Sequence, residues 1–200
     1  MSDKQSKWGL IIIDFQNDFL HANGAYSRGK ATSAEALLLA DRVVPVAKAV
    51  KQHGGMVAAS LFTLWPDTHG DPMISPHLFA NRPFLKKGDF KMGGWGHANL
   101  DAIASHVDVT VNKVAYSAFF NTQLDWFLRR AGITHLAVCG IVTNGGVAST
   151  VRDAHMRDYH TVVISDGCAA FSHKIHDAAI EDMSTVATVM DCKTFIQQLG

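Results

Sequence analysis

Five short apolar runs rich in β-branched residues alternate along this chain with longer segments of helical periodicity. The apolar runs are 9–13, 56–59, 107–111, 136–139 and 161–164. The segments with helical spacing are 34–53, 122–131, 147–159 and 176–189. The run 9–13, Gly-Leu-Ile-Ile-Ile, has no polar face, which predicts a strand covered on both sides as in parallel sheets. Alternating strands and helices predict right-handed crossovers, and hence an α/β fold with a doubly wound, mostly parallel sheet and helices on both faces.

The balance of residue types favours one folded domain and excludes two classes of partner. Hydrophobic residues make up 48% of the 200 residues and charged residues 18%, so the chain can bury a core and is not of the disordered class. No repeat, low-complexity segment or linker divides it, which predicts a single domain over 1–200 with a flexible N-terminus of about 1–7. The 18 basic and 18 acidic residues leave no net field to attract phosphate backbones or acidic membranes, so nucleic-acid and membrane binding are not expected.

The cysteines favour a reducing compartment. Cys139, Cys168 and Cys192 are an odd number, widely spaced and without a CxxC pair, so neither a disulfide framework nor a zinc knuckle is predicted. The apolar run 8–13 is too short for the core of a signal peptide or for a membrane span. We therefore expect a cytoplasmic protein.

The segment 63–97 interrupts the alternation of strands and helices. It contains Pro66, Pro72, Pro76 and Pro83 together with several glycines, which predicts a long irregular excursion. Excursions of this length inside compact domains usually serve as lids, as walls of a binding site or as contacts between subunits. All three roles remain open for this segment.

Two charged side chains stand at the ends of predicted strands. Asp14 follows the run 9–13 directly and Lys113 closes the run 109–113, so both are expected at the carboxyl edge of the sheet, where doubly wound folds bind ligands. Partly buried, they would set each other's charge state, as catalytic pairs require. The alternatives are that Asp14 caps a turn and that Lys113 extends its ammonium group to solvent. Asp18 is expected to be a cap or a loop brace.

A glycine-rich turn follows a third predicted strand, in the stretch 139–147 (Cys-Gly-Ile-Val-Thr-Asn-Gly-Gly-Val). Backbone can approach a ligand closely at such a turn, and free N–H groups at the start of the next helix could hold an anion or an oxyanion. The alternative is an ordinary strand-to-helix turn in which glycine supplies a positive φ. Neither GxGxxG after the first strand nor GxxxxGK[ST] occurs, so no dinucleotide or P-loop site is predicted.

Taken together, three motifs resemble those of the isochorismatase-like hydrolases, also called the cysteine hydrolase superfamily. They are Ile-Ile-Asp-Phe-Gln-Asn-Asp-Phe at 12–19, Lys-Val-Ala-Tyr-Ser-Ala-Phe-Phe-Asn-Thr at 113–122, and Gly-Ile-Val-Thr-Asn-Gly-Gly-Val-Ala-Ser-Thr-Val-Arg-Asp-Ala at 140–154. They occur in the family's order, and the resemblance extends over nearly the whole chain. It implies a Rossmann-like α/β hydrolase of small molecules without a cofactor. Most members of the family hydrolyse C–N bonds with an Asp-Lys-Cys triad.

Matched residue by residue, the resemblance makes Asp14 the acid/base, Lys113 its electrostatic partner and Gly146 the occupant of the position of the nucleophilic cysteine. Cys139 lies within the preceding strand and cannot replace it, since a buried strand cysteine is usually an inert hydrophobic residue. The residues that the resemblance places around the substrate are Gln16, Asn17, Phe19, Trp95, Tyr116, Phe119, Val142, Thr143, Asn144 and Gly145. For the aromatic residues among them, core packing is the alternative.

Glycine at position 146 leaves three functional hypotheses open, because glycine has no side chain with which to form a thioester. Known isochorismatases resemble this case: they carry glycine there, and an Asp protonates the vinyl carbon of a vinyl ether, which is then hydrolysed with release of pyruvate. However, the family's amide hydrolases carry the residue pair that this chain has at Thr143-Asn144. Hydrolysis of an amide or ureido C–N bond therefore remains the second hypothesis. The third hypothesis is a catalytically inactive homologue that binds a ligand.

The excursion 63–97 offers one candidate substrate contact and no metal site. Arg82 could bind a substrate carboxylate, with an ordinary surface arginine as the alternative. The nicotinamidase branch of the family uses an Asp-x-His metal motif after the second strand. In that region of this chain the Asp-x-His sequence occurs only at 67–69, displaced beyond Pro66. His77 and His97 are loop histidines of a kind that is usually solvated, so no metal is predicted.

The family resemblance also implies a homodimer or a homotetramer. The apolar residues Phe119, Trp126 and Phe127 could contribute to an interface between subunits. A buried helix face explains the same pattern equally well.

Overall fold

The structure, a computed structural model, describes residues 6–200 and contains a six-stranded sheet in which all paired strands are parallel. The strands are β1 (Trp8–Ile13), β2 (Met56–Phe62), β3 (Val109–Lys113), β4 (His135–Ile141), β5 (His160–Ala169) and β6 (Thr188–Met190). Their order across the sheet is β3-β2-β1-β4-β5-β6, so β1 and β4 are central neighbours. The chain leaves β1 towards β2 on one side and later enters β4 on the other. This reversal creates the switch point at which doubly wound sheets bind ligands.

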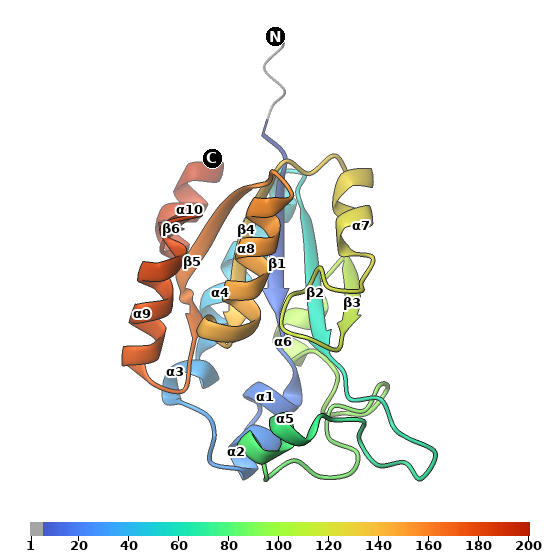
Figure 1. The fold of residues 1–200 in the computed structure, drawn as a ribbon. Helices are drawn as coiled ribbons and strands as arrows, with labels where there is room; N and C mark the ends of the chain where they lie inside the picture. The colour runs from blue at the N-terminus through green and yellow to red at the C-terminus, as the bar shows by residue number, and fades with distance from the viewer. Residues whose placement is uncertain (1–5) are drawn as a thin grey trace.

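Helices cover both faces of the sheet (Figure 1). The longer helices are α4 (Leu39–Gln52), α7 (Leu124–Arg130), α8 (Ala148–Met156), α9 (His173–Met183) and α10 (Cys192–Leu199). The short helices are α1 (Asn17–Leu20), α2 (Ala25–Arg28), α3 (Ala34–Leu37), α5 (Pro76–Asn81) and α6 (Asp101–Ala104). Helix α4 packs with α6 and α10 on one face, and α8 packs with α9 on the other. Helices α1, α2 and α5 gather beyond the carboxyl ends of the strands, at the lower end of Figure 1.

The position of β1 explains why the first apolar run is so uniformly hydrophobic. Residues 10–13 are completely buried, because β2 and β4 pair with β1 on its two sides and helices cover both faces. Burying one Leu or Ile side chain contributes roughly 1.5–3 kcal/mol to folding. Asp14, the first polar residue after this run, therefore marks the point at which the strand leaves the apolar core and enters the crevice.

The structure confirms the α/β class and the doubly wound sheet, and it shows one helix prediction to be wrong at its C-terminal end. The predicted helix 176–189 begins earlier and ends at Met183 as α9, whereas Thr188–Met190 forms the edge strand β6. A short apolar run is ambiguous between helix and strand, and here pairing with β5 decides. The predicted helix 34–53 is divided at Leu38 into α3 and α4. Helix α10 was not predicted, and α5 lies within the excursion that was expected to be irregular.

The predicted flexible N-terminus, 1–7, falls mostly outside the described residues. Lys7 itself is attached to the sheet, because its N–H donates to Thr134 Oγ1 at 3.2 Å and its carbonyl accepts from the N–H groups of Thr134 and His135. Within residues 6–200, every helix is too short or too polar to cross a membrane.

Candidate active site

Asp14 lies in the crevice at the end of β1 with its carboxylate already bound by two side chains. It has a φ of 57°, a left-handed conformation that Asp tolerates better than most residues, and this turns the chain sharply as it leaves the strand. Its Oδ2 lies 2.7 Å from Lys113 Nζ, and its Oδ1 accepts a hydrogen bond from the Ser60 hydroxyl. Only 3% of the residue is exposed. The carboxylate forms an ion pair and caps none of the described helices.

Lys113 reaches this carboxylate from a strand that is not adjacent to β1. Strand β2 lies between β1 and β3, and the Lys113 ammonium crosses over it, 5.4 Å from the centre of the Phe62 ring. Its Nζ also donates to the carbonyl of Ala115 at 3.1 Å. Lys113 is only 2% exposed, so its side chain does not extend to solvent. The parallel sheet thus brings together two charges that are far apart in the sequence.

Burial and pairing act in opposite directions on the Asp14 carboxyl. Burial raises its pKa above the ordinary value, and the positive charge of Lys113 and the hydrogen bonds from Lys113 and Ser60 oppose that rise. The net direction is upward. Asp14 is therefore able to hold a proton at a higher pH than a solvated aspartic acid, which suits a group that donates and accepts protons.

The glycine-rich stretch forms the π-helical turn η1 (Thr143–Val147), which follows a cis peptide bond between Ile141 and Val142. A Cβ atom built on Gly146 would lie 2.8 Å from Ile13 Cγ2 and 3.2 Å from the Ile141 carbonyl oxygen. Both are closer than ordinary contacts, so the packing in this structure is suited to glycine. The N–H of Gly145 donates to the Val142 carbonyl at 2.9 Å, and that donor is therefore used within the turn rather than offered to a ligand.

A cavity of about 290 Å³ brings Asp14, Lys113 and Gly146 together. Its walls come from the ends of β1, β2, β3 and β4, from α2, and from the excursion 63–97. The remaining lining residues are Phe19, Tyr26, Phe62, Ser75, His77, Leu78, Arg82, Val114, Ala115, Tyr116, Ile141 and Val142. The excursion thus forms a wall of the cavity, one of the three roles that its sequence left open.

Arg82 supplies a positive charge to this wall. Its Nε donates a 2.7 Å hydrogen bond to the Tyr26 hydroxyl, which orients the guanidinium group at the cavity. Burial raises the pKa of Tyr26, so the phenol stays protonated. Within residues 6–200, no carboxylate lies within ion-pair distance of Arg82, whereas Lys113 is neutralised by Asp14. Arg82 is the charged group of the lining that is left to attract an anion.

Three of the ten residues predicted around the substrate line this cavity, namely Phe19, Tyr116 and Val142. Gln16 and Asn17 instead brace the backbone around it. The Gln16 side chain donates to the carbonyls of Phe62 and His97 and accepts from the Phe62 N–H, and Asn17 Nδ2 donates to the Trp95 carbonyl. Asp18 is a loop brace, as expected: its carboxylate accepts from the N–H groups of Ala25 and Phe90.

The other five predicted contacts lie outside the lining. Trp95 is exposed and packs edge-on against His21, and the Phe119 ring stacks on Tyr159. Thr143 is hydrogen-bonded to His176. Asn144 is exposed, and Gly145 is buried, with the Tyr116 ring 3.2 Å from where its Cβ would lie. A direct role of these residues in substrate binding stays a prediction.

The lining residues that the three motifs do not contain come from β2, which supplies Phe62, and, apart from Arg82, from α2 and the excursion. Tyr26, Ser75, His77 and Leu78 line the cavity although none belongs to the three motifs. Ser75 followed by a proline is a recognisable signal for the start of a helix, and its hydroxyl does cap α5 by accepting from the Leu78 N–H. That signal could have located α5 but not the cavity that it faces.

The described cysteines and histidines form neither a nucleophile in this cavity nor a metal cluster. Cys139 is buried inside β4, and burial raises the pKa of its thiol well above the ordinary value. Cys168 and Cys192 are also buried, and none of the three lines the cavity. In the described part of the chain, no three His, Cys, Asp or Glu side chains come together as a metal site. The Asp67 carboxylate instead accepts from the N–H groups of His69 and Asp71 within a turn.

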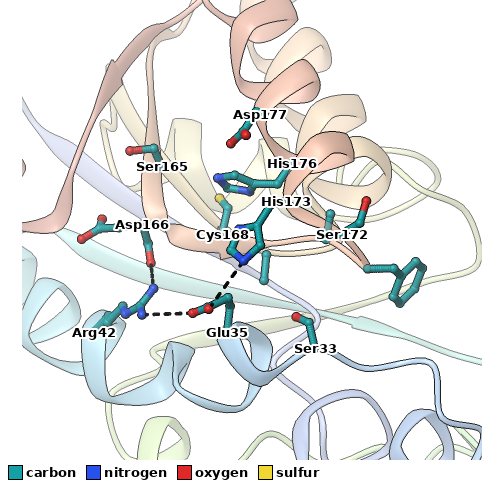
Figure 2. A pocket seen from close by; sticks show the side chains of 13 residues that line it. Ser33, Glu35, Arg42, Ser165, Asp166, Cys168, Ser172, His173, His176 and Asp177 are labelled. Carbon is teal, nitrogen blue, oxygen red and sulfur yellow. Dashed lines mark hydrogen bonds and ion pairs between the residues drawn. The ribbon is translucent and has the colours of Figure 1, made fainter.

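A second cavity of about 400 Å³ lies at the carboxyl end of β5 (Figure 2). Glu35 accepts from Arg42 and lies 3.7 Å from His173 on α9, and Arg42 donates to the Asp166 carbonyl. These charged groups are thus engaged with one another. His176 also lines this cavity, and its contact with Thr143 leads to the glycine-rich turn.

Comparisons with known proteins point to one family. The sequence model of the isochorismatase domain matches residues 9–194. Ureidoacrylate amidohydrolase RutB from Methylobacterium radiotolerans is 31% identical over 215 residues, covering 96% of this chain and 79% of that protein. An Arabidopsis thaliana protein named "Probable inactive nicotinamidase" is 30% identical over 195 residues, covering 93% and 92%. The crystal structure of an isochorismatase family protein from Desulfovibrio vulgaris matches with a TM-score of 0.81 and 25% identity, covering 98% and 99%.

Proposed function

This chain belongs to the isochorismatase family of hydrolases, and we propose that it hydrolyses a small molecule by acid-base chemistry of Asp14 and Lys113 without a cysteine nucleophile. The observation that carries the proposal is the buried Asp14–Lys113 pair, 2.7 Å apart, beside a cavity whose described lining contains no thiol. Ser75 is the one serine in the described lining, and its hydroxyl caps a helix by accepting from the Leu78 N–H. A covalent route through a side-chain nucleophile therefore has no support among these residues.

The reaction that suits these groups is hydrolysis of a vinyl ether with release of pyruvate. Protonated Asp14 donates its proton to the terminal vinyl carbon, and the ether oxygen stabilises the resulting cation as an oxocarbenium ion. Water adds to the cationic carbon, and the proton that it loses returns to the Asp14 carboxylate. The hemiketal then collapses to an alcohol and pyruvate. Lys113 stabilises the carboxylate while Asp14 is ionised.

The charge balance of the cavity supports a substrate that carries a carboxylate. With Asp14 protonated, as the proposed reaction requires, Lys113 and the half-buried guanidinium of Arg82 both bring positive charge to the cavity, and Arg82 has no acidic partner among the described residues. Guanidinium groups bind carboxylates through paired, charge-assisted hydrogen bonds. An enolpyruvyl ether has a carboxylate on the carbon that is attacked, so its binding by Arg82 would place the vinyl group between Arg82 and Asp14.

The experiment that tests this proposal measures pyruvate release from isochorismate by the purified protein. Asp14→Asn and Asp14→Ala are assayed beside the wild type, and circular dichroism checks that each variant is folded. We expect release by the wild type and a loss of about 10²–10⁴-fold in both variants, since that is the usual contribution of a positioned acid. Absence of pyruvate from the folded wild type, or equal rates in the variants, would overturn the proposed reaction.

Hydrolysis of a C–N bond is the second candidate, and the relative named as a ureidoacrylate amidohydrolase is the observation that favours it. The test measures ammonia release from ureidoacrylate by the wild type and by Gly146→Cys, with and without a thiol-alkylating reagent. Release of ammonia by the wild type would favour C–N hydrolysis by direct attack of water over hydrolysis of a vinyl ether. If only Gly146→Cys releases ammonia, and alkylation stops that release, the wild type lacks the cysteine nucleophile that C–N hydrolysis requires at position 146. Ligand binding without either reaction would indicate a binding homologue.

A further inference from the structure

A hydroxyl–imidazole contact links the glycine-rich turn to the second cavity. Thr143 Oγ1 and His176 Nδ1 lie 2.9 Å apart. Thr143 is completely buried and is the first residue of η1. His176 lies on α9, is half-buried, and has its ring among the side chains of the second cavity (Figure 2). The contact therefore holds one end of the turn from outside the cavity of Asp14.

A second buried hydroxyl holds the other end of the same turn. Thr150 Oγ1 donates to the Gly146 carbonyl at 2.7 Å and accepts from the Ala118 N–H at 3.0 Å. Gly145 lies between these two contacts and Gly146 accepts the second, and glycine has more backbone freedom than any other residue. A glycine-rich segment keeps one geometry only where its neighbours hold it. The hydroxyl contacts at both ends of the turn thus act together with the backbone bond from Gly145 to Val142 in fixing the position of Gly146.

We infer that His176 is a positioning residue, which holds the η1 turn through Thr143 and so fixes the distance between Gly146 and Asp14. The inference rests on the proposed function, because Gly146 and Asp14 line the same cavity. His176 is absent from that lining and is separated from the reacting groups by Thr143. Its effect on the reaction is therefore transmitted by the backbone of the turn.

A neighbouring histidine provides a matched control. His173 precedes His176 by one helical turn on α9 and lines the same second cavity. Its side chain is 79% exposed and faces Glu35, 3.7 Å away. Replacing His173 changes the lining and volume of the second cavity but leaves the contact to Thr143 intact. Any effect specific to His176 thus reports on the turn rather than on the cavity.

The first test observes the turn directly, through the backbone amide signals of Gly145 and Gly146 in ¹⁵N-labelled protein. We expect His176→Ala and Thr143→Val to displace both signals, and His173→Ala to leave both in place. Asn can place an amide nitrogen near the position of the imidazole Nδ1, so His176→Asn should restore the wild-type signals. Unchanged glycine signals in a folded His176→Ala protein would overturn the inference.

The second test measures pyruvate release by the same variants. We expect His176→Ala to lower kcat about tenfold with little change in KM, because a small displacement of a site element reduces turnover more than binding. Thr143→Val should have the same effect, and the double variant should be no worse than either single one, since both remove one contact. Additive losses, or an equal loss in His173→Ala, would overturn the inference. If the wild type releases no pyruvate, the proposed function fails, but the amide signals of Gly145 and Gly146 still test whether His176 holds the turn. The two failures can therefore be told apart.

Discussion

Asp14 and Ser60 are hydrogen-bonded to each other twice. The Asp14 N–H donates to the Ser60 carbonyl, and the Ser60 hydroxyl donates to Asp14 Oδ1, both at 3.0 Å. Ser60 is also the residue of β2 that pairs with Ile13, so one residue fixes both the end of β1 and the orientation of the carboxylate. The other carboxylate oxygen is thereby directed at Lys113. The acid is oriented by the sheet itself.

Ser60→Ala should shift the pH dependence of the proposed reaction towards higher pH. The Ser60 hydroxyl lowers the pKa of Asp14 by bonding its charged form, so its removal raises that pKa further. Because the proposed acid is the protonated form, kcat/KM declines as the pH rises through the pKa of Asp14. This decline should begin at a higher pH in Ser60→Ala. Initial rates measured across a pH series provide the check, with Ser165→Ala on β5 as a control, and a decline at lower pH would contradict it.

Lys113→Met should destabilise the protein because it leaves the Asp14 carboxyl without its buried counter-charge. Removing one partner of a buried ion pair costs about 3–5 kcal/mol, and protonation of Asp14 limits that cost. The double variant Asp14→Asn/Lys113→Met removes both charges, and Asn tolerates the positive φ at position 14. Its free energy of unfolding should therefore exceed that of Lys113→Met. Urea unfolding followed by circular dichroism measures the difference, and equal stability of the two variants would argue against a stabilising pair.

Arg82→Ala should raise the KM for a substrate that carries a carboxylate by about 10–100-fold, the usual effect of losing a charge-assisted hydrogen bond. The methyl ester of the same substrate lacks the negative charge and should be affected much less. Tyr26→Phe removes the hydroxyl that orients the Arg82 guanidinium, so it should raise the KM in the same direction but less. Steady-state kinetics with both substrates separate these effects. Arg130→Ala, on the exposed surface of α7, is the control. Equal losses on acid and ester would refute carboxylate recognition.

Gly146→Ala should lower the free energy of unfolding by roughly 1–3 kcal/mol, the range expected for overpacking. The added Cβ would lie 2.8 Å from Ile13 Cγ2, a contact that the side chain must move to relieve. Ile13→Ala removes that methyl group, so the double variant should lose less stability than the sum of the two single changes. Chemical denaturation of the three variants tests this. If the losses of stability in the two single variants simply add in the double variant, the contact with Ile13 is not what favours glycine at position 146.

Substitution of Trp126 tests whether the surface around it forms an interface between subunits. Its side chain is 61% exposed and its ring lies edge-on to Phe127, whereas Phe119 is buried and unavailable to a partner. If the protein is the homodimer or homotetramer that the family resemblance implies, Trp126→Glu should shift it towards monomer in sedimentation experiments. Met156→Glu, on an equally exposed site of α8, is the control. A monomeric wild type, or an unaltered assembly in Trp126→Glu, would exclude this surface as an interface.

The elements that could be predicted are those whose signal is local. The run 9–13 has apolar side chains on both faces, as is typical of a strand in a parallel sheet with both faces covered, and the structure buries both. Strand β6 and helix α10 were missed because their short apolar segments become strand or helix only through packing against β5 and α4. The spacing of apolar residues along the chain predicts a helix or strand that is buried on a regular face. It does not predict an element at the edge of the fold whose structure depends on contacts with one neighbouring element.

The sequence by itself determined the α/β class, the burial of the first strand on both faces, and the presence of Asp14 and Lys113 at one edge of the sheet. Each follows from residues next to one another in the chain and from the rule that parallel strands end on the same side. Only the tertiary structure decided that Lys113 crosses β2 to reach Asp14 and that Tyr26 presents Arg82 to the same cavity. These contacts join residues far apart in sequence, and Arg82 comes from an excursion that has no periodicity of its own. Their geometry depends on long-range packing, which no local pattern of residues encodes.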